Sequence, residues 1–545
     1  MRKTMAALAA LALALLAARA GWAEEFSGSY QMTENGKTAG AEKFTISFES
    51  DGRVVCESQG AIKQGQAEAS DYSRLVMRTL SGPVHTYQRE AVVDKLPHAL
   101  TATNENGTLH IERHEGPHKK DHPLSISPAT LVVDVGVWHH LHLLIRRYSH
   151  RLGGEQKFTI VIPSELRIVD GVSLRLIGRE PVALQNGWFM ANKYFFNRID
   201  IGMIIWADSK GQIIKIESPM QGYVVELVKY AGERATAAGP PRRVSGDVNY
   251  EAVEIPGDGL KLTGVLTKPR NLQARLPGVA FLADGGRIDR DGNALALNVN
   301  IGTGETLDTV SQGGCVVLRV DARGVGGSEG DLAAVTLSQR ERDAETMLDY
   351  LKQRPDVDPN RLAIVGMGEG ANVAIMTAAA RPDVKAVVLL SPSDAPLSQL
   401  AEEQMKSRVA LEGGEPDSWK TMTVANLLRM AREKPEQKTF LLAGRLVYLD
   451  VYREWFNMRP VDDLKKSAAR ILHVQASKDL QVFPRFADGF RQAFVGDKRY
   501  TFKMFDGLNH FYKPSHGTIG EYVDPAAQVD PAFVAYLSDW LKANL

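Results

Sequence analysis

The sequence is poor in cysteine and carries no excess of charge of either sign. Only Cys56 and Cys315 occur among its 545 residues, so a disulfide-stapled scaffold is excluded, and neither thiol lies in a pattern typical of a nucleophile. Lysine plus arginine and aspartate plus glutamate both number 65, which gives no reason to expect a nucleic acid or an anionic membrane as partner. Beyond the N-terminus no apolar run is long enough to cross a bilayer, so no stable membrane span is expected.

The N-terminus instead predicts a secretory signal peptide over residues 1–23. A basic start precedes an apolar run over residues 5–18, and small-x-small cleavage sites end at Ala20 and Ala23. This run is shorter than the roughly 20 residues of a membrane-spanning helix. We therefore expect an exported protein, periplasmic or extracellular, that is cleaved after one of these two alanines.

Residues 24–232 predict a β-rich N-terminal domain. Short runs alternate between apolar and polar residues, and Asx-Gly turns separate many of them, which is typical of an antiparallel meander built from hairpins. The pattern loosely resembles the curved, half-open sheets of exported bacterial proteins that cradle apolar ligands. The turn dipeptides are Asn35-Gly36, Asp51-Gly52, Asn106-Gly107 and Asn186-Gly187.

A Pro-rich linker at residues 233–245 leads to a second domain of different texture, residues 246–545. Apolar strand-like runs alternate there with helical stretches, which predicts a mostly parallel sheet flanked by helices. The alternation pauses over residues 392–470, where the sequence is amphipathic and rich in methionine and leucine. We expect this segment to form a helical cap over the carboxyl ends of the strands, where open α/β sheets bind ligands. Ordinary packing helices are the alternative.

One segment of the second domain has the backbone pattern of a nucleophile elbow. Residues 361–374 read RLAIVGMGEGANVA, an apolar strand followed by G-x-G-x-G and a helix of small residues. The central position of such a turn normally holds the attacking serine. Here it holds Gly368, so the turn is preserved and the hydroxyl is absent.

Other motifs resemble those of the α/β-hydrolase superfamily, specifically its bacterial esterase-like and serine aminopeptidase-like branch. Where that branch has G-S-G-P-x-D-R-D-G-N, residues 284–293 read DGGRIDRDGN, which keeps the second half and one aligned glycine. The resemblance implies an α/β-hydrolase fold and hydrolysis of carboxylic esters, thioesters or small amides. It also covers a D-x-R-G-x-G-x-S loop and a helical aspartate, whose polar residues we expect to be structural: Asp321, Arg323, Ser328 and Asp343.

The same resemblance assigns the remaining catalytic positions. Asp479 follows an apolar strand, and His510 lies in G-L-N-H-x-F, so they take the places of the acid and the base. The backbone N–H of Glu369 and that of Gly285 or Gly286 are expected to form the oxyanion hole. Only the nucleophile is missing, at Gly368.

Ten of the thirteen histidines fall between His85 and His150, but their spacing does not predict a metal site. The ladder of every fourth histidine, from His110 to His122, is interrupted by Gly116-Pro117, which breaks helical alignment. The cluster at residues 139–142 shows no carboxylate partner in the sequence. We predict no metal and no cofactor.

Two functional hypotheses remain open. The first is a secreted hydrolase-like protein with impaired or water-based catalysis, because removing the serine of a well-studied protease triad costs about a millionfold and leaves roughly 10³ to 10⁴ over water. The second is a noncatalytic protein that binds an apolar ligand or a protein partner. Retention of Asp479 and His510 favours the first, and loss of the serine favours the second.

Overall fold

In the computed structural model the chain divides into two compact units, residues 1–240 and 241–545. The structure describes residues 24–34, 37–64, 67–93, 96–115, 118–235, 248–271, 274–294, 299–411, 419–442 and 445–545. The expected signal peptide lies outside these residues, as does most of the expected linker. No helix within the described ranges is long and apolar enough to span a membrane.

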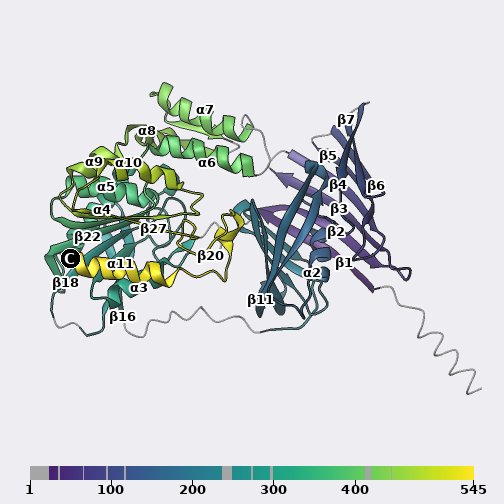
Figure 1. The fold of residues 1–545 in the computed structure, drawn as a ribbon, viewed down its shortest axis with the longest axis horizontal. Coiled ribbons are helices and arrows are strands. Elements are labelled where there is room, and N and C mark those ends of the chain that lie inside the picture. Colours follow the sequence, from purple (N-terminus) through teal and green to yellow (C-terminus); the bar gives the residue numbers. More distant parts are fainter. Residues whose placement is uncertain are drawn as a thin grey trace, which may run out of the picture. The chain divides into compact units, whose positions relative to one another are not determined.

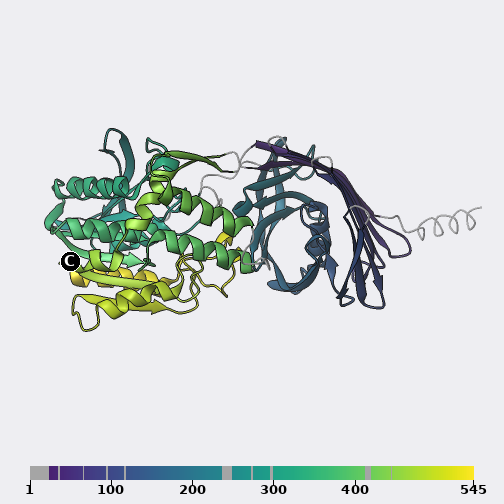
Figure 2. The ribbon, with the colours of Figure 1, turned by 90° about the horizontal axis from the view of Figure 1, so that it is seen from above.

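The first unit is one antiparallel sheet of fifteen strands, and it is strongly curved (Figure 2). Its strands follow one another almost in sequence order, β8 to β1 and then β15 to β9, and among the described strands only β9 and β10 are parallel neighbours. Register shifts interrupt several pairs, for example between Met32 and Thr33, and such bulges bend a sheet. Asn106 and Gly107 both have positive φ, 53° and 91°, as the predicted tight hairpin turn requires.

The strands and helices of the first unit have the following bounds: β1 Glu24–Glu34, β2 Lys37–Phe48, β3 Val54–Gln64, β4 Ala67–Met77, β5 Val84–Val93, β6 Leu96–Glu105, β7 Thr108–Glu115, β8 His118–Ser125, β9 Leu131–Val132, η1 Trp138–His140, α2 Leu141–Arg147, β10 Glu155–Ile162, η2 Pro163–Glu165, β11 Arg167–Leu184, β12 Gly187–Arg198, β13 Ile201–Ala207, β14 Ile213–Ser218, η3 Pro219–Gln221 and β15 Tyr223–Leu227.

The histidine cluster of this unit lies in η1 and α2 and is buried. His139 Nδ1 lies 2.7 Å from Glu42 Oε1, so β2 supplies a carboxylate partner that the sequence did not reveal. Burial lowers the pKa of the His142 imidazole to about 3, and its Nε2 accepts the backbone N–H of Ile213 at 3.0 Å. These contacts make the cluster part of the hydrogen-bonded core.

The second unit has a sheet of eight strands in the order β16-β17-β21-β18-β22-β23-β26-β27, parallel from β21 to β27 (Figure 1). Helices α3 and α11 pack their apolar side chains on one face and α4 and α5 on the other. The predicted fold class, an α/β-hydrolase fold preceded by an antiparallel β domain, is confirmed.

The main elements of this unit have the following bounds: β16 Val248–Pro256, β17 Lys261–Pro269, β18 Leu276–Leu282, β19 Asn293–Ala294, β20 Val299–Asn300, α3 Thr303–Gln312, β21 Val316–Val320, η4 Leu332–Ala334, α4 Leu337–Lys352, β22 Val357–Met367, α5 Glu369–Ala380, β23 Val384–Leu390, β26 Arg470–Ala476, η5 Pro484–Ala487, α10 Asp488–Ala493, β27 Tyr500–Phe505, η6 Gly520–Val523 and α11 Pro531–Asn544.

The segment 392–470 inserts between β23 and β26. Figure 1 shows α6 and α7 as a helical layer that projects from the rest of this unit. Leu427, Ala431 and Leu449 form a small core of their own. The segment also contains a two-stranded hairpin, which its amphipathic pattern did not predict. Its elements are α6 Leu397–Leu411, α7 Trp419–Glu433, β24 Thr439–Leu442, β25 Arg445–Tyr448, α8 Leu449–Asn457 and α9 Pro460–Lys466.

Candidate functional site

The strand β22 and the helix α5 meet at Gly368 in a sharp turn. Gly368 has φ 54° and ψ −120°, a conformation that side chains rarely adopt, and its N–H donates to Leu390 O at 2.9 Å. The turn therefore has the strained strand-turn-helix geometry of a nucleophile elbow. A Cβ atom added at Gly368 would overlap the Oδ1 atom of Asp284.

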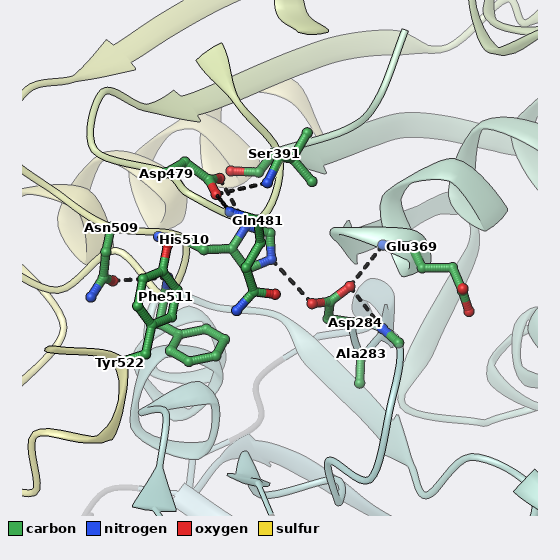
Figure 3. Close-up of polar contacts among 12 residues, drawn as sticks. Ala283, Asp284, Glu369, Ser391, Asp479, Gln481, Asn509, His510, Phe511 and Tyr522 are labelled. Atoms are coloured by element: carbon green, nitrogen blue, oxygen red, sulfur yellow. Dashed lines mark hydrogen bonds and ion pairs between the residues drawn. The ribbon is translucent and has the colours of Figure 1, made fainter. Parts of the chain in front are cut away.

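Asp284 fills the space beside Gly368, although its motif predicted no such role for it. It follows β18, and its Oδ1 accepts the backbone N–H of Gly285 at 2.7 Å and that of Glu369 at 2.8 Å (Figure 3). These are two of the three amides expected to form an oxyanion hole. The third residue, Gly286, is exposed and has φ 96°. The structure thus brings Gly285 and Glu369 together around a carboxylate oxygen of the chain itself.

The second oxygen of Asp284 faces the histidine. His510 Nε2 lies 3.1 Å from Asp284 Oδ2, and His510 Nδ1 lies 2.8 Å from Asp479 Oδ2. The loop after β26 holds Asp479 firmly, because its Oδ1 accepts the backbone N–H groups of Gln481 and Val482, each at 2.8 Å. His510 is therefore clamped between two carboxylates (Figure 3).

These carboxylates set the charge of the site. Burial alone would lower the pKa of His510, but the charge of Asp479 and hydrogen bonds to both carboxylates outweigh it and raise this pKa to about 10. Burial likewise opposes ionisation of Asp284, yet the hydrogen bond and charge of His510 and the two backbone N–H groups hold its pKa below the usual range. The raised pKa favours the imidazolium form of His510 at neutral pH, and in that form the ring cannot accept a proton.

Arg340 of α4 supports the loop from behind. It pairs with Glu369, and its guanidinium donates to the backbone oxygen of Ala283, the residue before Asp284. On the cap, burial first and the charge of Glu369 second raise the pKa of Tyr452, so α8 lies close to the N-terminal end of α5. Tyr452 of α8, in the segment 392–470, thus belongs to the surroundings of the site.

The polar side chains of the 321–328 loop mainly hold the backbone in place. Asp321 accepts the N–H groups of Arg290 and Gly327, both at 2.8 Å, and Arg323 makes a paired contact with Asp343 at 2.7 and 2.8 Å. Within the part of the chain that the structure describes, no three His, Cys, Asp or Glu side chains gather as metal ligands would.

The second unit has an α/β-hydrolase fold, and its sequence is similar to those of esterases and related hydrolases. Residues 330–442 match the model of the dienelactone hydrolase family. Esterase EstD of Thermotoga maritima is 23% identical over 299 residues, which are 54% of this chain and 68% of that enzyme.

A shorter match is to thiohydrolase apmlB of Arthrinium phaeospermum, 34% identical over 84 residues. The chain spans only 27% of that protein, and the match covers 15% of this chain. Among solved structures, Est1E of Butyrivibrio proteoclasticus with bound ferulic acid is 19% identical, with 54% of this chain and 97% of that chain covered and a TM-score of 0.37. An esterase of Pyrococcus furiosus is 15% identical, with 56% and 97% covered and a TM-score of 0.36.

Proposed function

We propose that the second unit descends from hydrolases of carboxylic esters, thioesters or small amides and no longer performs serine-type acyl transfer. One observation carries the proposal: Asp284 Oδ1 accepts both backbone N–H groups that an acyl substrate would need. Gly368 offers no hydroxyl to attack the substrate. The hydrolase fold and the His510–Asp479 pair are retained, but they surround the carboxylate of Asp284 instead of a serine hydroxyl.

The charge of the site supports the same proposal. A serine mechanism needs a neutral histidine that takes the proton of the nucleophile. Because two carboxylates raise the pKa of His510 to about 10, the imidazole is already protonated at neutral pH. A carbonyl oxygen that entered the site would also have to displace the carboxylate of Asp284, so the water-based catalysis left by loss of a serine is suppressed as well.

The test is turnover of short p-nitrophenyl esters by the purified protein. We expect a rate within about tenfold of buffer alone, because neither nucleophile nor free oxyanion hole is present. A serine esterase assayed in parallel serves as the control. Turnover at the rate of that esterase would contradict the proposal.

A second function, binding of an apolar ligand, is favoured by a cavity in the first unit. It has a volume of about 360 Å³, within the range of small-molecule sites. Its charged side chains are compensated, since Arg89 pairs with Asp71 and Asp134. We propose a neutral, largely apolar ligand for it. The apolar lining includes Met32, Ala39, Val133, Trp138, Leu141, Ile160, Phe196, Met203 and Tyr223.

We also propose that the protein is exported through its N-terminal signal. The support is the pattern of residues 1–23, with a basic start, a short apolar run and two cleavage sites.

A further inference from the structure

The two oxygens of Asp284 differ in their surroundings. Oδ1 is held by two backbone N–H groups, at 2.7 and 2.8 Å, whereas Oδ2 faces the His510 imidazole, with 3.1 Å between Oδ2 and Nε2. The two backbone hydrogen bonds fix the position of Oδ1 and leave Oδ2 available to a substrate. The side chain of Asp284 is 13% exposed, while those of His510 and Asp479 are fully buried. A molecule that enters the site therefore meets Asp284 first.

Gly368 makes this arrangement possible. Because a Cβ at position 368 would overlap Asp284 Oδ1, the attacking serine of a relative and the carboxylate of Asp284 compete for one space. The carboxylate thus stands where the nucleophile of the fold belongs, between the oxyanion-hole amides and the histidine. Carboxylates act as covalent nucleophiles in several enzyme classes.

We propose that Asp284 is the nucleophile of this site and that its substrate carries an electrophilic saturated carbon with an oxygen leaving group, of which an epoxide is the simplest case. This rests on the proposed function, the absence of serine-type acyl transfer. An acyl carbonyl is disfavoured because Oδ1 already fills the oxyanion hole. Attack on a saturated carbon creates no carbonyl oxyanion on the substrate, so the substrate does not need the oxyanion hole.

In the first step a lone pair of Asp284 Oδ2 forms a bond to the epoxide carbon, and the carbon–oxygen bond of the ring breaks. The ring oxygen takes the proton from His510 Nε2. The products are a hydroxyalkyl ester of Asp284 and a neutral imidazole, so no outside acid is needed. Loss of the negative charge of Asp284 removes one of the two carboxylates that keep His510 protonated.

In the second step water attacks Cγ of Asp284 and gives its proton to the neutral His510. The negative charge develops on Oδ1, directly in front of the N–H groups of Gly285 and Glu369. Collapse of the intermediate breaks the ester bond, and the departing alkoxide takes the proton from His510. The regenerated carboxylic acid of Asp284 returns its proton to the imidazole, and the net reaction is epoxide plus water to diol. Asp479 orients the ring of His510 and stabilises its protonated form in both steps.

Isotope transfer tests the covalent step. The full-length protein is incubated with phenyl glycidyl ether in H₂¹⁸O. This aromatic probe is chosen because Tyr452 and Trp455 of α8 make an edge-to-face contact, with 4.8 Å between their ring centroids. Digestion with trypsin in ordinary water then releases residues 276–287, LPGVAFLADGGR, whose one side-chain carboxylate is that of Asp284. We expect ¹⁸O in this peptide and formation of the diol.

The Asp284→Asn protein should lose diol formation by more than about 10³-fold, while Asp506→Asn, the same change at an exposed aspartate close to His510 in sequence, should not change it. Thermal unfolding of both proteins checks that they are folded. Diol formation without ¹⁸O in the peptide, or no diol at all, would overturn the inference. Neither outcome bears on the proposed loss of acyl transfer, which fails only if p-nitrophenyl esters are turned over.

Discussion

At the scale of single residues, Gly368 and Asp284 form a complementary pair. A side chain at 368 and a carboxylate at 284 exclude each other, because the added Cβ would overlap Asp284 Oδ1. In the hydrolase branch that this chain resembles, the loop position of Asp284 is a glycine and the elbow position of Gly368 is a serine. This chain has an aspartate on the loop and a glycine at the elbow. The glycine leaves the space that the aspartate side chain occupies.

Asp284 joins Asp479 in raising the pKa of His510. We expect the imidazole to stay protonated as the pH rises from 6 to 9, because its pKa is raised to about 10 from an unperturbed value of about 6.5. In Asp284→Asn one of the two carboxylates becomes neutral, so the pKa should fall by at least about one unit. Imidazole ¹⁵N shifts measured over this pH range report both values.

Asp506→Asn again serves as the control, since it removes an exposed carboxylate and should leave the His510 titration unchanged. A wild-type His510 that titrates near pH 6.5 would show that Asp284 does not face it.

The missed role of Asp284 shows where residue patterns stop being informative. His510 and Asp479 could be predicted because each lies in a motif with a fixed place after a strand. The orientation of Asp284 depends on partners 85 and 226 residues away in the chain, the amide of Glu369 and the ring of His510. A loop carboxylate carries no local signal of which distant amide it will accept.

At the scale of elements, the strand-turn-helix pattern around Gly368 and the hairpin turn at Asn106-Gly107 were predicted correctly. The antiparallel order of β1 to β8 follows from alternation and Asx-Gly turns, which act locally. The hairpin of β24 and β25 was missed because short apolar runs fit either a strand or a buried helix. The carboxylate partner of the histidine cluster was also missed, because Glu42 lies 97 residues before His139 in the chain.

The elements around the cavity of the first unit give a prediction about ligand binding. Ala39 on β2 is 4% exposed and lines the cavity, so Ala39→Leu should fill part of it and weaken binding of an apolar probe by about tenfold or more. The fluorescence of Trp138, which also lines the cavity, follows a titration with a neutral apolar dye.

The matched control is Ala91→Leu on β5, an alanine that does not line this cavity. If the wild-type and Ala39→Leu proteins bound the dye with equal affinity and the dye did not change the fluorescence of Trp138, this cavity would not be the binding site.

At the scale of the whole molecule, composition and texture were enough to predict the fold class. Short runs that alternate between apolar and polar residues, as before the linker, are typical of a sheet buried on one face. Apolar strands that alternate with helices, as after the linker, are typical of a sheet buried on both faces. What the chain acts on is not encoded at that scale, because the fold accommodates many chemistries and the site decides among them.

The proposed export is likewise tested at the scale of the whole chain. In a Gram-negative host we expect the protein in the periplasmic fraction with Gly21 or Glu24 as its first residue, because cleavage is predicted after Ala20 or Ala23. Mass spectrometry of the intact N-terminus measures this, and replacing residues 5–18 by a polar segment should abolish processing. A cytoplasmic protein that retains residues 1–23 would contradict the prediction.

The central claim is that Asp284 occupies the place of the serine nucleophile. Labelling by a fluorophosphonate, measured as the intact mass of four proteins, tests it most directly: wild type, Gly368→Ser, the double variant Gly368→Ser with Asp284→Gly, and Gly368→Ala with Asp284→Gly. Only the double variant Gly368→Ser with Asp284→Gly should be labelled at position 368. It alone combines a hydroxyl, an open oxyanion hole and a histidine that contacts one carboxylate instead of two. Equal labelling of Gly368→Ser with Asp284 still in place would contradict the account.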